Sequence, residues 1–347
     1  MSDSDEVVPA IRDWNRRGID FVLTTVVGVR GSTYRGLAAR QLVAADGTMI
    51  GTVSGGCLDN DLIAIAADMS SSGPALLVEF DLTADDEAVW GWGIGCNGAT
   101  QLLVEPGPAA AQLVDLIEQE PEAILHVLGG GDLGAHRAIG TGDEEWAGAV
   151  AEAQRDGRHR RVHREGVDYL LEIMSSPPRL VICGAGHDAV PLARLGKELG
   201  YEITVVDDRR AFLTRERFPE ADRLVQCAPR ELSDRIDVDD RTSFVIMSHN
   251  YVRDVDFLGS LLGKGAAYIG CLGPGERLER MLKDLATRDQ HPAPTDPIYG
   301  PAGLDLGADG PTEIAWSILA EIMSVRRHRR GGPLVERKGP AGWRPVP

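Results

Sequence analysis

The chain has 347 residues, a length that favours two domains over a single hydrophobic core. Hydrophobic residues make up 43% and charged residues 26%, as in soluble globular proteins, and no apolar run approaches the ~18 residues of a membrane span. The formal net charge of −17 argues against nucleic acid as the main partner. The acidic N-terminus MSDSDEVVPA lacks the apolar region of a signal peptide, so we expect a cytoplasmic protein.

The first half predicts a mixed α+β domain, which we place at residues 1–174 with its connecting segment. Phe21–Val29 is rich in β-branched residues, as strands are. Asp46-Gly47 stands between two apolar runs, which indicates a hairpin. The segment LDNDLIAIAADMS, from Leu58, has the apolar spacing of a helix. The hairpin therefore leads into a turn between strand and helix.

Two glycine-rich loops each carry a cysteine. The first is TVSGGCLDNDL and the second is GWGIGCNGAT, and their candidate binding residues are Ser54, Gly55, Gly56, Cys57, Gly95, Cys96 and Asn97. Glycines let a ligand approach the backbone, and a helix N-terminus attracts anions and favours the thiolate form of cysteine. We predict ligand contacts at both loops. The alternative is that each cysteine is a small apolar residue in a tight turn.

The rest of the first half contains further strands and a polar connection. ALLVEFDLT, ATQLLVEP and the start of PEAILHVLGGGDLG predict strands, and residues 141–164 predict a helix with a connecting loop. The prolines of SSPPRL, residues 175–180, interrupt regular structure and mark a linker.

After the linker the pattern changes to a βαβ unit, so we expect an α/β fold with a Rossmann-like, doubly wound parallel sheet at residues 179–325. Residues 184–189 read G-x-G-x-x-A between a predicted strand and a predicted helix. This context predicts nucleotide binding. Its candidate residues are Gly184 for the turn, Gly186 and His187 for phosphate, and Asp207 or Asp208 for a ribose hydroxyl.

Further buried strands are predicted at RLVQC, SFVIMSH and AAYIGCLG, before a last helix at PTEIAWSILAEIMSV. His249 follows one of these strands, where doubly wound folds place ligands. It is either a base or ligand contact, or a solvated loop histidine. Residues 331–347 are predicted to be a disordered tail.

The five cysteines of the chain are widely spaced and form no CxxC pair. The sequence therefore predicts neither a disulfide framework nor a structural zinc site. Cys183 and Cys271 lie in or beside apolar strands and are expected to be buried, inert thiols.

Several motifs in order resemble proteins of the XdhC/CoxI family. They are VRGSTYRGLAARQLV, GTVSGGCLD, DLTADDEAVWGWGIGCNG, LVICGAGHDAVPLA, VIMSHNYVRDVDFL, YIGCLG and GLDLGADGPTEIAWSILAEI, and they extend from about Val26 to about Val325. The resemblance implies a maturation factor for molybdenum hydroxylases such as xanthine and carbon monoxide dehydrogenases. Such a factor binds molybdenum cofactor, in some cases as a dinucleotide, and assists its sulfuration and delivery.

The implied ligand agrees with the residues. Arg30, Arg35 and Arg40 carry guanidinium groups that match phosphate, and the thiolates of Cys57 and Cys96 suit molybdenum or its sulfur ligand. The resemblance implies an apo-hydroxylase as partner, with a cysteine desulfurase and a homodimer as further expectations. It leaves open whether the cofactor is nucleotide-free or a cytosine or guanine dinucleotide. In CLGPGERLERMLKDL, residues 271–285, the expected basic stretch is diluted by Pro274, Gly275 and Glu276.

The residues by themselves also allow two other functions. The dinucleotide motif allows an NAD-dependent oxidoreductase, with His249 as the group that transfers a proton. Cys57 and Cys96 allow a persulfide or redox carrier. A binding protein without catalytic residues is the reading that we favour.

Overall fold

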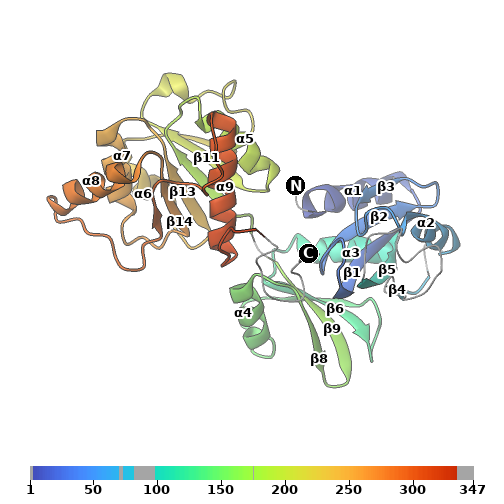
Figure 1. Ribbon diagram of the computed structural model, residues 1–347. Coiled ribbons are helices and arrows are strands. Elements are labelled where there is room, and N and C mark those ends of the chain that lie inside the picture. Colours follow the sequence, from blue (N-terminus) through green and yellow to red (C-terminus); the bar gives the residue numbers. More distant parts are fainter. Residues whose placement is uncertain (1–2, 70–72, 82–97, 175, 334–347) are drawn as a thin grey trace, which may run out of the picture. The chain divides into compact units, whose positions relative to one another are not determined.

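The computed structural model describes residues 3–69, 73–81, 98–174 and 176–333. They form two compact units, an N-terminal one that ends at Ser175 and a C-terminal one from Ser176 to Pro333 (Figure 1). The division falls within the proline-containing stretch 175–180. In the described part of the chain, no helix has the length and apolar character needed to cross a membrane.

The N-terminal unit begins with a five-stranded antiparallel sheet of order β3-β2-β1-β5-β4. Its strands are β1 (Phe21–Gly31), β2 (Arg40–Ala44), β3 (Met49–Gly51), β4 (Leu76–Asp81) and β5 (Gly98–Pro106). Its helices are α1 (Asp3–Arg17), α2 (Asp59–Asp68) and α3 (Gly107–Ile117). Leu23 of β1 packs with α1 and α3, whereas Val22 packs with α2. Alternate residues of a strand face opposite sides, so both faces of this sheet are covered.

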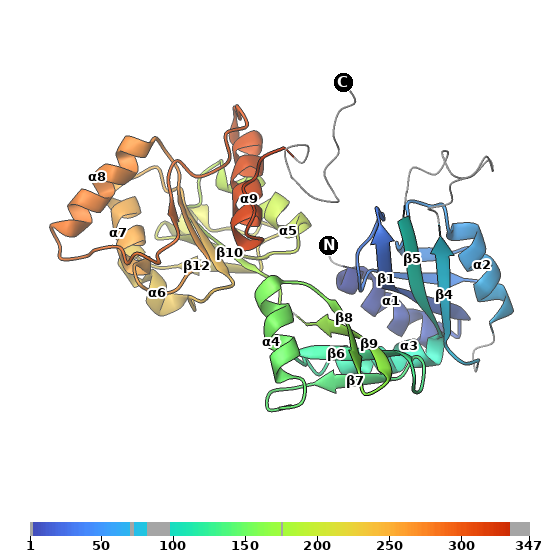
Figure 2. The same ribbon diagram turned by 60° about the horizontal axis from the view of Figure 1, so that its bottom comes forward.

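A second antiparallel sheet completes the N-terminal unit, with strand order β7-β6-β9-β8 (Figure 2). It contains β6 (Ala123–Gly129), β7 (His136–Ile139), β8 (Arg160–Arg164) and β9 (Val167–Ile173), and α4 (Ala147–Asp156) packs against it. Residues 160–164 form a strand where the sequence predicted a connecting loop. Their charges obscure the pattern because β8 is an edge strand with exposed positions.

A buried ion pair joins these two sheets. Arg40 of β2 binds the carboxylate of Glu172 on β9 through both terminal nitrogens, one of them 2.8 Å from Oε1. Nε2 of His126 lies 2.7 Å from the same carboxylate. This position corrects the expectation of a phosphate contact for Arg40, because its side chain is only 3% exposed and is held by Glu172.

The charge of Arg40 also determines the state of its partner. Burial by itself would raise the pKa of Glu172, but Arg40 and the hydrogen bond with His126 hold that pKa well below its usual range. Glu172 is therefore a buried carboxylate that stays ionised in the folded protein.

The C-terminal unit is the predicted doubly wound fold. Its six-stranded parallel sheet has the order β12-β11-β10-β13-β14-β15, with strands β10 (Arg179–Cys183), β11 (Glu202–Asp207), β12 (Arg223–Gln226), β13 (Thr242–Ile246), β14 (Tyr268–Cys271) and β15 (Ile298–Tyr299). Helices α5 (Ala189–Glu198) and α9 (Pro311–Arg326) cover one face. Helices α6 (Leu232–Arg235), α7 (Tyr251–Leu261) and α8 (Gly275–Ala286) cover the other (Figure 1). The α/β fold class is thereby confirmed.

Replacing Arg40 tests the buried pair. We expect Arg40→Met to lower the free energy of unfolding of the N-terminal unit by about 3–5 kcal/mol, because the buried Glu172 carboxylate loses its guanidinium partner and keeps only His126. Urea unfolding with hydrogen exchange of the β9 amides measures the change. Arg30→Met is the control, since Arg30 is 66% exposed in its ion pair with Asp81 and should change stability by less than about 1 kcal/mol. Equal effects of the two substitutions would contradict this assignment.

The depressed pKa of Glu172 also predicts a pH dependence. A carboxyl group whose pKa is lower in the folded than in the unfolded chain contributes stability above the unfolded value, roughly 4.3, and loses it as pH falls through the folded value. We therefore expect wild-type stability to fall more steeply below about pH 4 than that of Glu172→Gln. Urea unfolding at a series of pH values compares them. Parallel curves would show that Glu172 is not the group responsible.

Candidate ligand-binding site

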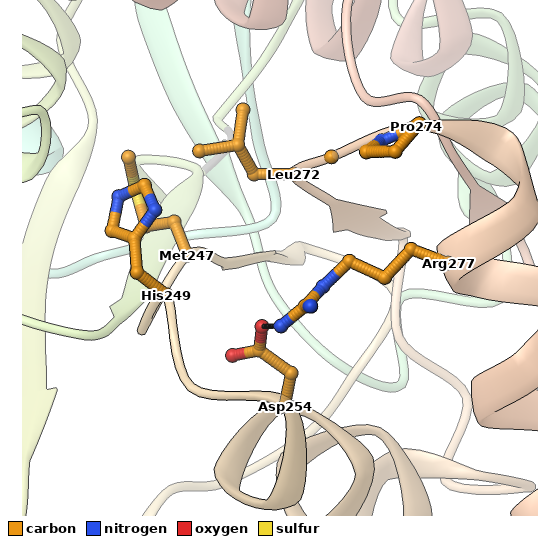
Figure 3. Close-up of a pocket in the computed structure, with 7 residues that line it drawn as sticks. Met247, His249, Asp254, Leu272, Pro274 and Arg277 are labelled. Carbon is orange, nitrogen blue, oxygen red and sulfur yellow. Dashed lines mark hydrogen bonds and ion pairs between the residues drawn. The ribbon is translucent and has the colours of Figure 1, made fainter.

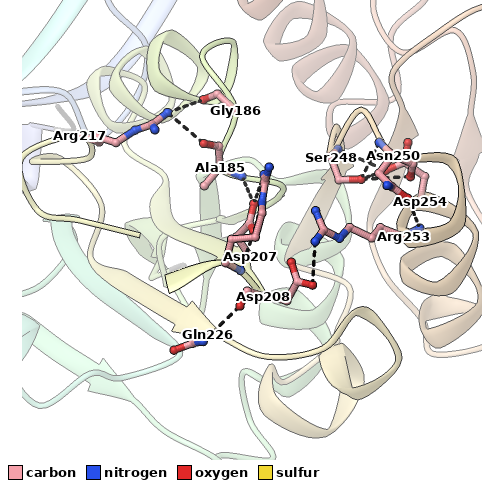
Figure 4. A network of polar contacts seen from close by, with 11 residues as sticks. Ala185, Gly186, Asp207, Asp208, Arg217, Gln226, Ser248, Asn250, Arg253 and Asp254 are labelled. Atoms are coloured by element: carbon pink, nitrogen blue, oxygen red, sulfur yellow. Dashed lines mark hydrogen bonds and ion pairs between the residues drawn. The ribbon is translucent and has the colours of Figure 1, made fainter. Parts of the chain in front are cut away.

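The sequence-predicted turn lies where the strand order of the parallel sheet reverses. The chain leaves β10 at Cys183 towards α5 on one face, and it leaves β13 at Ile246 towards α7 on the other. Loops that diverge from neighbouring strands are the usual position of ligands in doubly wound folds. The candidate site is built from these two loops, residues 184–188 and 247–250 (Figure 4).

The two loops meet at Gly184, which requires glycine. Its φ is +119°, and a Cβ there would lie 2.6 Å from Cα and 2.7 Å from N of Ser248. Those atoms are backbone and cannot move aside as a flexible side chain would. The predicted role of Gly184 in the turn therefore has a specific physical cause.

Asp207 holds this turn from the neighbouring strand. Its Oδ2 accepts a hydrogen bond of 2.8 Å from the N–H of Ala185, and Arg209 donates to both of its oxygens. Burial opposes ionisation, but these hydrogen bonds hold the pKa of Asp207 well below its usual range. Only 3% of the side chain is exposed. Because its oxygens are used within the protein, Asp207 is less available for the predicted ribose contact than Asp208, the other residue that the sequence indicated.

Asp208 is the more accessible of the two acidic residues. Its side chain is 36% exposed and forms an ion pair of 3.0 Å with Arg253 in the first turn of α7 (Figure 4). Asp208 follows β11 and Arg253 follows β13, and these strands lie on either side of β10. The ion pair therefore crosses the carboxyl end of β10. Asp208 remains the candidate for a hydroxyl contact, and the sequence did not single out Arg253.

The start of α5 offers backbone donors. Within the described residues, the hydrogen bonds of the turn use the N–H groups of Gly184 and Ala185 but not those of Gly186 and His187. Arg217 fastens the turn from outside, since its Nη2 donates to the carbonyl of Ala185 at 3.0 Å. Unpaired N–H groups before a helix N-terminus are the usual donors to an anion, so Gly186 and His187 remain the candidate phosphate contacts.

His249 forms a pair with a largely buried carboxylate. Its Nε2 lies 2.5 Å from Oδ2 of Asp188, at the N-terminus of α5. The other oxygen of Asp188 is buried and has no hydrogen-bond partner among the described residues. His249 has a φ of +55°, a backbone conformation that residues other than glycine rarely adopt. The sequence indicated His249 but not Asp188.

A second network crosses from β13 to α8. Asp254 of α7 accepts hydrogen bonds from N and Oγ of Ser248, and Nη2 of Arg277 lies 2.7 Å from its Oδ2. Sequence reasoning missed all three residues. A signal was available, because Asp254 is an acidic residue on the buried face of an amphipathic helix, together with Leu258 and Leu261.

Asp254 and Arg277 also line a hollow of about 260 Å³ beside the turn (Figure 3). Its walls are Met247, His249, Asp254, Leu272, Gly273, Pro274 and Arg277. The carboxyl ends of β13 and β14 supply most of this lining.

In the N-terminal unit, the loop that precedes α2 has a defined conformation. Oγ of Ser54 accepts hydrogen bonds from the N–H groups of Gly56 and Leu58, and Gly56 has a φ of +102°. Cys57 is partly exposed at the start of α2. The ring of Tyr34 lies beside Gly55.

The other predicted residues of this unit have different surroundings. The second glycine-cysteine loop, with Gly95, Cys96 and Asn97, lies outside the described residues. Arg30 is exposed and 2.7 Å from Asp81, and Arg35 is half-buried between β1 and β2. No group of three potential metal ligands is placed to bind an ion in the part of the chain that the structure describes.

Cys183 and Cys271 are buried, as the sequence predicted. Burial raises the pKa of the Cys183 thiol and raises that of Cys271 to about 12. Both residues are packed in the apolar core on the α7 side of the sheet.

Comparison with known proteins agrees with this architecture. Residues 180–322 match the XdhC Rossmann domain, and residues 14–81 match the XdhC and CoxI family. The chain belongs to the XdhC and CoxI family. The sequence resemblance is thereby confirmed, and it includes both structural units.

Two relatives and one solved structure align with almost the whole XdhC-type chain. A probable xanthine dehydrogenase subunit of Bacillus subtilis is 29% identical over 88% of this chain and 93% of its own length. The molybdenum cofactor insertion chaperone PaoD of Escherichia coli is 25% identical over 89% of this chain and 84% of its own. A crystal structure of a xanthine dehydrogenase from Bacillus halodurans has a TM-score of 0.72 and 27% identity, covering 97% of this chain and 98% of that one.

Gly184→Ala tests the contact between the loops. The new Cβ meets the backbone of Ser248 and the positive φ adds strain, so we expect a loss of stability of roughly 2–4 kcal/mol in the C-terminal unit. Thermal unfolding followed by circular dichroism measures it. Gly200→Ala is a matched control, since Gly200 also has a positive φ but nothing within 4 Å of the added atom. Equal losses would leave the loop contact without energetic importance.

Proposed function

We propose that this protein binds molybdenum cofactor and assists its sulfuration and its insertion into a molybdenum hydroxylase of the xanthine or carbon monoxide dehydrogenase type. The observation that carries the proposal is the turn 184–187 before α5, where the hydrogen bonds of the described residues hold Gly184 and Ala185 and leave the N–H groups of Gly186 and His187 for a ligand. The relative named as a molybdenum cofactor insertion chaperone supports the choice of cargo.

The residues present suit such a cargo. The cofactor carries phosphate, for which the proposed donors are the N–H groups of Gly186 and His187, just before the N-terminus of α5. A nucleotide form, such as the cytosine dinucleotide, also carries ribose hydroxyls, for which Asp208 is the available acceptor. The phosphate end of the cargo is therefore assigned to the C-terminal unit.

The thiols of Cys57 and Cys96 are the proposed contacts for the molybdenum or its sulfur ligand. Cys57 is suited to this because it is partly exposed on a glycine-rich turn before α2. Arg30, which is 66% exposed, and the half-buried Arg35 are the further phosphate contacts proposed for that unit. The proposal includes an apo-hydroxylase that receives the cofactor, a cysteine desulfurase that supplies sulfur, a homodimeric state and a cytoplasmic location.

A second candidate is an NAD-dependent oxidoreductase. The His249–Asp188 pair favours it, because a histidine oriented by a largely buried carboxylate is a common general base. The comparison with known proteins weighs against it, since one relative is named as a molybdenum cofactor insertion chaperone. We therefore place the chaperone function first.

Cofactor retention tests the proposed role of Cys57. We expect Cys57→Ala to fold normally but to retain molybdenum cofactor roughly tenfold less well, as the loss of one contact to a metal group typically does. The protein is purified anaerobically, and its bound small molecule is identified and quantified by mass spectrometry. Cys227→Ala is the control, since it removes a thiol from the C-terminal unit that has no proposed part in binding.

Transfer to the hydroxylase gives a second measurement of the same variant. Loading of the apo-enzyme by Cys57→Ala should fall together with retention. A nicotinamide cofactor found bound in place of the pterin would contradict the proposed cargo. Normal loading by a Cys57→Ala, Cys96→Ala double variant would contradict the proposed role of the thiols.

A further inference from the structure

The hollow beside the turn has the size of one ring system. Its volume of about 260 Å³ is below the range of roughly 300–1,000 Å³ that holds a drug-sized ligand. A complete pterin cofactor or dinucleotide exceeds it, but a single flat heterocycle fits. The hollow therefore suits one end of a larger ligand.

The walls of the hollow are mainly apolar. Met247, Leu272 and Pro274 provide the surfaces against which a flat ring packs (Figure 3). Gly273 brings the backbone close to Arg277, since a Cβ at this position would lie 2.9 Å from Cδ of that arginine. Apolar walls with a few placed polar groups are typical of small-molecule sites.

Arg277 is the cation at the edge of the hollow, and it is neutralised. Its Nη2 lies 2.7 Å from Oδ2 of Asp254, and its guanidinium stands 5.3 Å from the ring centre of Tyr251. Among the described contacts its side chain donates to Asp254 alone, so N–H groups remain for a ligand. Because the pair has no net charge, it favours an uncharged ring with an oxygen acceptor over a second phosphate.

His249 connects the hollow with the anion site. It lines the hollow and its Nε2 contacts Asp188 at the start of α5. A ligand with its phosphate on the turn 184–187 can therefore extend past His249 towards the hollow.

We propose that the hollow binds the flat, oxygen-bearing heterocycle of the ligand, with Arg277 donating to the ring oxygen. The identity of the ligand as a phosphorylated heterocycle rests on the proposed function. The chemistry is shared by pterins and by the bases cytosine and guanine, and adenine lacks the oxygen. This also explains the diluted positive charge of residues 271–285, because an uncharged ring needs one oriented donor and not a cluster of cations.

Calorimetric titration of the full chain tests this, with pterin, CMP, GMP, AMP and inorganic pyrophosphate as probes. Leu272→Trp fills the hollow, and Arg277→Lys keeps the charge beside Asp254 but loses the fork. One or more of the oxygen-bearing ring probes should bind the wild-type protein. We expect either substitution to weaken the affinity for such a probe roughly tenfold or more, and to leave the affinity for pyrophosphate unchanged. Arg280→Lys is the control, since Arg280 also stacks on Tyr251, at 5.1 Å, but does not line the hollow.

The probes also separate the two sources of the ring. Preference for pterin assigns the hollow to the pterin end, and preference for CMP or GMP assigns it to a nucleotide end. Equal binding of AMP, no binding of any ring probe, or unchanged ring binding by folded Leu272→Trp would overturn the inference. The proposed function fails separately, if anaerobically isolated molybdenum cofactor does not bind while the ring probes still respond to these substitutions.

Discussion

The candidate site depends on a contact between two stretches of backbone with no side chain between them. Gly184 lies against Ser248, so the loops that follow β10 and β13 support each other at the edge of the sheet. Asp207 then fastens Ala185 from β11, and Arg217 holds the carbonyl of Ala185 from outside. The backbone just before the candidate donors Gly186 and His187 is thereby held from several sides, and a preorganised backbone lowers the entropic cost of binding.

Most of the charged side chains described around this turn form ion pairs. Three of the cations described near it have carboxylate partners: Arg209 with Asp207, Arg253 with Asp208, and Arg277 with Asp254. A chain of net charge −17 therefore offers an anion here mainly backbone dipoles and paired guanidinium groups. Such pairs orient their remaining N–H groups without creating a strong positive field. This arrangement favours a ligand recognised by shape and hydrogen bonds, with phosphate at one point only.

The N-terminal unit uses charge for a different purpose. Arg40, Glu172 and His126 are buried where its two sheets meet, so the pairing of these groups helps to determine how the sheets pack. Removing one partner is costly because the other cannot reach water. The loop with Ser54 and Cys57 lies on the same five-stranded sheet as Arg40, after β3. That sheet thus positions a candidate contact loop whose conformation is held by the hydrogen bonds that Ser54 accepts from Gly56 and Leu58.

The sequence by itself determined much of the architecture. Apolar periodicity and turn chemistry predicted β1, the Asp46-Gly47 hairpin, α2 and most of the parallel sheet, because these signals are local. Glycine spacing indicated the turn at 184–186. His249 was indicated by its position directly after a predicted strand. The edge strand β8 was missed because its exposed charges resemble a loop.

Only the tertiary structure decided how the charged residues are used. Arg30, Arg35 and Arg40 look alike in sequence, yet Arg40 is paired inside the core with a residue 132 positions away. Asp207 and Asp208 are adjacent, but one faces the turn and the other faces Arg253. Asp188, Asp254 and Arg277 join the site through contacts between separate loops and helices. A side chain's partner is set by which strands become neighbours, and that information is spread over the whole fold and is absent from any single motif.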